Sequence, residues 1–110
     1  MIYAHLDEEN LNAQYRPKIL KTDVHKNICD GLNSLYVAKN HDYGDSFGET
    51  FKEEGFAASR IRLTDKLNRF KKLTRDGGQQ VNDESIRDTL IDLANYAIMT
   101  LVELEVNDDF

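Results

Sequence analysis

The sequence has 110 residues but only one cysteine, one proline and no tryptophan. The single cysteine, Cys29, excludes an intramolecular disulfide and a zinc site built from several cysteines. We expect Cys29 to pack as a small buried apolar side chain. No apolar run approaches the roughly 18 residues of a transmembrane helix, and the first residues show no signal-peptide pattern. The sequence therefore predicts a cytoplasmic protein that has no contact with a membrane.

The motifs of several enzyme classes are also missing. The chain has no nucleophile-elbow, P-loop or dinucleotide-binding motif, and its three histidines have no partners at metal or triad spacing. A formal net charge of −6 argues against non-specific binding to nucleic acid, which requires a basic surface. An acidic protein is still compatible with a small phosphorylated ligand that is bound through Mg²⁺.

Helical periodicity is present over most of the chain. Apolar residues recur at three- and four-residue spacing, and only short runs within these periods hint at strands. We predict an all-α protein: one domain (1–110) that is a small bundle of three long helices and a short one. Its predicted parts are an N-terminal arm (1–21), the bundle (22–106) and a frayed tail (107–110), with long helices over 24–40, 56–76 and 83–106, a structured loop over 40–48 and a short helix over 49–55.

The last predicted helix carries an acidic strip. With about 100° of turn per residue, Glu84, Asp88, Asp92 and Asn95 fall within about 80° of one another. Apolar residues continue this strip toward the C-terminus, which predicts that the carboxylates face a cleft. Mg²⁺ would relieve their mutual repulsion there, since its preferred ligands are oxygen atoms. The alternative is an acidic first turn that favours the helix dipole, which explains Glu84 but not Asp92.

Another side of the same helix is apolar. Its residues share about 100° of the helix circumference, as is typical of a side that packs on a core. We therefore expect this apolar side to face the interior of the bundle. It consists of Ile86, Leu90, Leu93, Ala94, Ala97, Leu101 and Leu104.

The predicted middle helix carries a charged strip, formed by Arg62, Asp65, Lys66 and Arg69. In one interpretation the strip faces solvent, and Asp65 pairs with the two arginines. In the other it binds phosphate, because arginine offers a fixed fork of donors and lysine a mobile charge. A basic strip opposite an acidic one would form a metal–phosphate site, in which Asp65 orients the cations or joins the metal ligands.

The predicted loop contains two large rings, Tyr43 and Phe47, that could stack on a base or could close the end of the bundle. Ser46 lies between them and could contact a ligand or cap the next turn. The sequence leaves both interpretations open.

Three stretches, "KNHDYGDSF", "RIRLTDKLNRFKKL" and "VNDESIRDTLIDLANYAIM", together resemble a family of phages and bacteria, the nucleotide modification associated domain 1 family. The resemblance implies a nucleotide-related role. The layout is also distantly similar to the MazG-like all-α nucleoside triphosphate pyrophosphohydrolases, which are usually dimeric and use Mg²⁺ held by acidic residues on two helices. The first family's pattern falls on Tyr43, Gly44, Ser46, Phe47, Arg62, Asp65, Lys66, Arg69, Glu84, Ser85, Asp88, Thr89, Asp92, Asn95 and Tyr96.

We accordingly predict a homodimeric, Mg²⁺-dependent nucleotide-binding protein and, if it is an enzyme, a nucleoside triphosphate pyrophosphohydrolase. The alternative is a small acidic phage protein that acts by binding, either by sequestering a nucleotide or by inhibiting a host or defence protein. A structural helical domain without a site is the third interpretation. The predicted metal ligands are Glu84, Asp88, Asp92 and Asp65, with Glu84 and Asp88 also catalytic, and the predicted ligand-binding residues are Tyr43, Ser46, Phe47, Arg62, Lys66, Arg69 and Asn95.

Overall fold

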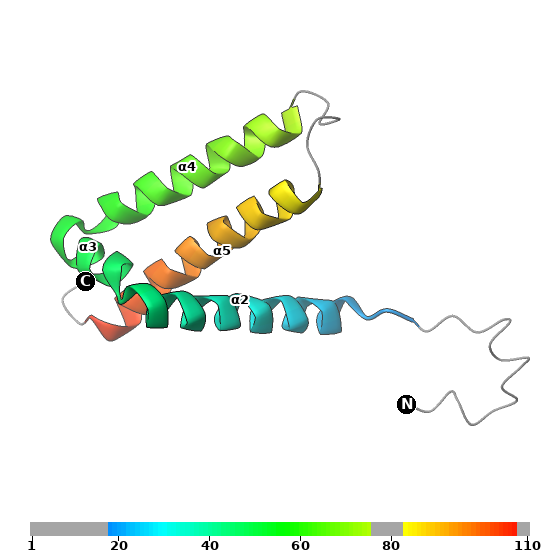
Figure 1. Ribbon diagram of the computed structural model, residues 1–110, viewed down its shortest axis with the longest axis horizontal. Helices are drawn as coiled ribbons and strands as arrows, with labels where there is room; N and C mark the ends of the chain where they lie inside the picture. The colour runs from blue at the N-terminus through cyan, green and yellow to red at the C-terminus, as the bar shows by residue number, and fades with distance from the viewer. Residues whose placement is uncertain (1–17, 76–82, 108–110) are drawn as a thin grey trace, which may run out of the picture. The chain divides into compact units, whose positions relative to one another are not determined.

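A computed structural model describes residues 18–75 and 83–107 of the chain. These residues form four helices and no strand, which confirms the all-α prediction of three long helices and a short one (Figure 1). None of the described helices is both long and apolar enough to cross a bilayer. The predicted arm lies almost wholly outside the described residues, and so does the predicted tail after residue 107. The helices are α2 (Lys21–Tyr43), α3 (Ser46–Glu54), α4 (Phe56–Arg75) and α5 (Asp83–Val106).

The chain divides into two units, residues 1–31 and residues 32–110, and the boundary falls within α2. In the first unit the described residues are those that precede α2 and the first half of that helix. The prediction that Cys29 is buried is wrong: its side chain is exposed and contacts His25 one turn earlier, with 3.8 Å between Sγ and Nδ1. A single helix cannot enclose its own side chains, so Val24 and Ile28 are exposed in this unit as well.

In the second unit α4 and α5 lie side by side and run in opposite directions (Figure 1). The second half of α2 leads into α3 through only two residues, Gly44 and Asp45. The predicted structured loop over residues 40–48 is therefore wrong, because both helices extend into it. Gly44 makes the tight turn possible with φ of 73°, a conformation that residues with a Cβ atom rarely adopt.

The interior of the second unit is small and partly polar. Leu32, Phe51 and Ala58 are its buried apolar residues, and Phe51 is fully buried. Ser59 of α4 and Thr100 of α5 share a hydrogen bond of 2.6 Å between their hydroxyl groups, which links the two helices. Every buried side-chain nitrogen or oxygen atom among the described residues has a hydrogen-bond partner, as a stable interior requires.

The predicted core-facing side of α5 is largely wrong. Leu90, Ala97 and Leu101 are exposed, whereas Thr89 and Glu103 are buried. The helix turns its smaller and more polar residues toward its neighbours, where hydroxyl groups satisfy one another and carbonyl oxygens. Sequence periodicity identified the apolar side correctly, but hydrophobicity did not decide which side of α5 faces inward.

Candidate functional site

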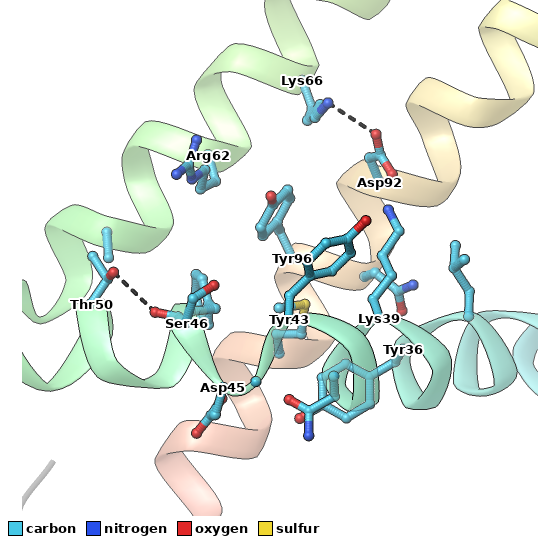
Figure 2. Close-up of a pocket in the computed structure, with 17 residues that line it drawn as sticks. Tyr36, Lys39, Tyr43, Asp45, Ser46, Thr50, Arg62, Lys66, Asp92 and Tyr96 are labelled. Atoms are coloured by element: carbon cyan, nitrogen blue, oxygen red, sulfur yellow. Dashed lines mark hydrogen bonds and ion pairs between the residues drawn. The ribbon is translucent and has the colours of Figure 1, made fainter.

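A pocket of about 460 Å³ opens in the second unit, within residues 35–99 (Figure 2). All four described helices contribute to it, with α2 doing so through its second half. The lining is mixed: it holds three cationic side chains, two carboxylates and four aromatic rings. The volume lies within the range of small-molecule sites, and the lining is more polar than in most of them.

The junction between α2 and α3 forms one wall of the pocket. The Asp45 side chain accepts a hydrogen bond of 3.2 Å from the backbone N–H of Gly48 and so caps the N-terminus of α3. An alanine Cβ at position 48 would collide with the Asp45 carboxylate, so glycine is needed there for the cap. The cap fixes Ser46 at the start of α3 and Tyr43 at the end of α2, both of which line the pocket.

Cationic side chains reach the pocket from two helices. Lys66 of α4 forms an ion pair with Asp92 of α5, with 2.9 Å between Nζ and Oδ2 (Figure 2). Both side chains are about one-third exposed, at 29% and 33%. Arg62 lies one turn before Lys66 on α4, and Lys39 extends from α2 toward α5 in the same view. Asp92 thus holds one cation in place, while the pocket offers two more.

Aromatic rings form a continuous row beside these charges. Phe47 packs against Tyr96 with 5.8 Å between ring centroids, and against Phe51 at 6.2 Å. Phe51 in turn contacts Phe56 edge-on at 5.7 Å. Phe47 therefore packs on rings of α3 and α5 and also lines the pocket. Tyr43 is different, because the residue is 76% exposed and its side chain is accessible to a ligand.

Asn95 of α5 lines the pocket but donates a hydrogen bond of 3.3 Å to the backbone carbonyl of Leu32 in α2. This bond helps to hold the second half of α2 beside the pocket. The Asn95 side chain thus has a structural partner in addition to any role toward a ligand.

The remaining predicted site residues lie elsewhere. Glu84, Asp88, Asp65 and Arg69 are exposed and do not line the pocket, so Asp92 alone of the four predicted metal ligands does so. Within residues 18–75 and 83–107, no group of three or more His, Cys, Asp or Glu side chains lies close enough to hold a metal. The Mg²⁺ site on Glu84, Asp88 and Asp92 stays a prediction, and the described side chains fit an anion better than a metal.

Sequence reasoning missed several residues of the pocket, among them Tyr36 and Lys39 of α2. Together with Tyr43 they follow one side of the helix at three- and four-residue spacing, which was the available signal. The signal was hard to use because the same spacing in Tyr36 and its apolar neighbours also fits a core-facing side.

One known family matches the chain. The sequence model of the family described as nucleotide modification associated domain 1 matches residues 39–104, more than half of the chain. The matched range contains most of the pocket, from Lys39 to Met99. No curated protein and no solved structure shows a significant match.

Proposed function

The chain belongs to the nucleotide modification associated domain 1 family, and we propose that its pocket binds a nucleotide. The observation that carries the proposal is that cationic and aromatic side chains line the same pocket. A nucleotide is an anion attached to a flat aromatic base, so it needs both kinds of side chain close together. The family description associates the domain with nucleotide modification and agrees with a ligand of this class.

Local charge supports an anionic ligand. The chain as a whole carries a formal charge of −6, yet the pocket is lined by Lys39, Arg62 and Lys66 against Asp45 and Asp92, three positive side chains to two negative. Asp45 is engaged in capping α3, and Asp92 is engaged with Lys66. The lining thus carries one net positive charge (three minus two) in an acidic protein, which favours an anionic ligand.

The phosphate end of the ligand is assigned to α4. Arg62 offers a planar fork of donors that matches two phosphate oxygens, and Lys66 adds a charge that Asp92 already positions. A lysine held by a carboxylate loses less conformational freedom when it meets an anion. Lys39 would contact the same phosphate group from α2.

The base end is assigned to the tyrosines. Tyr43 presents an exposed ring, and Tyr96 presents a ring held against Phe47. Stacking of a base on an aromatic side chain contributes about 1–3 kcal/mol and tolerates any base. The proposal therefore covers nucleotides as a class.

Binding tests the proposal directly. We would titrate the protein calorimetrically with nucleoside mono- and triphosphates and with the matching nucleosides, in EDTA and in Mg²⁺. Lys66→Met should weaken binding of the phosphorylated ligands by about tenfold or more, the equivalent of about 1.4 kcal/mol, and leave nucleoside binding unchanged. Lys72→Met is the matched control, because Lys72 lies on α4 but is exposed and outside the pocket. The proposal fails if no nucleotide saturates the protein or if both variants lose affinity equally.

Metal-dependent hydrolysis is a separate proposal that the same pocket can test. If Asp92 only positions Lys66, Asp92→Asn should change phosphate binding by the same small factor in EDTA and in Mg²⁺, because the lost positioning and the removed carboxylate charge act in both buffers alike. If Asp92 is a Mg²⁺ ligand, the same variant should lose binding and any release of pyrophosphate in Mg²⁺. Saturable binding without any product would favour nucleotide sequestration over catalysis.

A further inference from the structure

The outward side of α5 carries exposed apolar residues in a regular order. Leu90 is 42% exposed and Leu101 is 60% exposed, and between them lie Ala94, which is half-buried, and Ala97, which is exposed. We name these four residues the outward strip. At about 100° per residue they fall within about 60° of one another, so they form one narrow line along the helix. None of them lines the pocket.

The spacing within the outward strip is that of a helix-pairing seam. The intervals are four, three and four residues, and Leu104 continues the strip after three more. Alternation of three and four residues is the heptad spacing by which two helices pack side by side. The strip contains no charged residue, so it can be buried without desolvating an ionised group.

The outward strip is also self-complementary when read in opposite directions. Its order is Leu, Ala, Ala, Leu about a midpoint between Asn95 and Tyr96, so reversal leaves the order and the spacing unchanged. A surface that matches its own reverse suits a two-fold interface, in which each residue of one copy contacts the equivalent partner on the other. The two central alanines let the helix axes approach closely, and the two leucines close the ends.

We propose that a second copy of this chain packs on the outward strip, with the two α5 helices antiparallel. Leu90 then lies opposite Leu101 of the second copy, and Ala94 lies opposite Ala97 of the second copy. The proposed pairing gives the predicted homodimer a defined interface. The pairing does not depend on the nucleotide proposal, because the outward strip lies outside the pocket.

Charge complementarity favours the antiparallel direction. Arg87 and Glu105 are both exposed and lie on the same edge of α5, close to opposite ends of the strip. Antiparallel pairing brings Arg87 to within about 2 Å, along the helix axis, of Glu105 of the second copy. In a parallel pair the edge that carries Arg87 would instead lie opposite the other edge of the second copy, so Arg87 and Glu105 would not meet.

Oligomeric state provides the first test. We expect the full chain to sediment as a dimer in analytical ultracentrifugation, and Leu101→Glu to raise the dimer dissociation constant by about 100-fold, because a carboxylate would be buried without a partner. Ile61→Glu is a closely matched control: Ile61 lies on α4, outside the strip, and is 59% exposed against 60% for Leu101. The control should change the dissociation constant less than about twofold.

A wild-type protein that stays monomeric at every concentration would overturn the proposal. This holds even if another protein or another segment of the same chain covers the outward strip. Equal dissociation of the two variants would overturn it too, and so would a dimer that survives Leu101→Glu.

Cross-linking tests the direction of pairing. In a Cys29→Ser background, which removes the exposed native thiol, Leu90→Cys and Leu101→Cys proteins would be oxidised separately and as an equal mixture. The mixture should form a disulfide-linked dimer and each protein alone should not, because positions 90 are separated by about 16 Å along an antiparallel pair. Cross-linking of each protein alone would show a parallel pair and overturn the antiparallel proposal.

Discussion

The two sides of α5 contrast with each other in a way that reverses the usual amphipathic helix. Thr89 and Glu103 on the inward side are 2% and 6% exposed, whereas Leu101 on the outward side is 60% exposed. Apolar area in water costs about 25 cal/mol per Å², so the outward side is stabilised only when something covers it. The polar side chains of the inward side can be buried because each buried nitrogen or oxygen atom of the described side chains has a hydrogen-bond partner.

The contrast indicates that the two sides of α5 make different contacts: hydrogen bonds on the inward side and apolar packing on the outward side. Polar groups on the inward side fix the geometry of one chain, since each bond requires a particular partner at a particular distance. The outward strip requires only a matching apolar surface, which a second copy would provide in the proposed dimer. The pocket lies on the inward side, where Asp92 and Tyr96 meet residues of the neighbouring helices.

The largest effect on stability is expected at Phe51, the fully buried aromatic residue of α3. Phe51→Ala should lower the free energy of unfolding by about 3–5 kcal/mol, because Phe51 is fully buried and packs on Phe47 and Phe56. Urea unfolding followed by circular dichroism measures this loss. Phe56→Ala should cost less, since Phe56 is about half exposed. Equal losses for the two variants would contradict the structure's placement of Phe51 in the interior.

The next effect concerns the buried carboxylate of Glu103. Asn107 donates hydrogen bonds to its Oε1 at 2.9 Å and to its backbone carbonyl at 2.8 Å. Asn107→Ala should destabilise the protein by about 1–3 kcal/mol, because the buried carboxylate loses a donor. Adding Glu103→Met to that variant should recover part of the stability, as no charge is then buried. A double variant that is less stable than Asn107→Ala would show that Glu103 has further stabilising contacts.

A smaller effect on stability is expected when one residue on each side of α5 is changed to valine. Thr100→Val makes the inward side more apolar but should lower the free energy of unfolding by about 1 kcal/mol, because it removes the hydrogen bond to Ser59. Ile98→Val on the exposed outward side should change it by less than about 0.5 kcal/mol. Thermal unfolding of both variants decides the comparison, and stabilisation by Thr100→Val would show that the shared hydroxyl bond contributes nothing.

Much of the fold follows from the sequence. The periodicity of 56–76 and 83–106 predicts helices whose bounds agree with α4 and α5 as far as the described residues extend. The predicted loop over 40–48 failed because its Asn, Asp and Gly content indicates irregular structure, whereas Gly44 alone makes the turn and Asp45 starts the next helix. Composition marks a turn well but does not give its length.

The pocket was accessible to sequence reasoning only in part. Arg62, Lys66 and Asp92 stand out because charges at helical spacing are visible in the sequence, and all three line the pocket. The ion pair between Lys66 and Asp92 could not be derived, because residues 26 positions apart meet only through the packing of α4 on α5. Lys39 was missed because its spacing from Tyr36 and Tyr43 also fits a core-facing side of the helix.

The smallest effect on nucleotide affinity is expected at Asp88, which belongs to the same acidic strip of α5 as Asp92. Asp88 is exposed and does not line the pocket, whereas Asp92 lies one turn further along and pairs with Lys66. Asp88→Asn should therefore change nucleotide affinity less than about twofold in EDTA or in Mg²⁺, since an exposed charge outside the pocket is screened by solvent and salt. Calorimetric titration measures it against wild type. A tenfold loss confined to Mg²⁺ would instead mean that Asp88 and Asp92 act together on a metal, because screening weakens an exposed charge equally in both buffers.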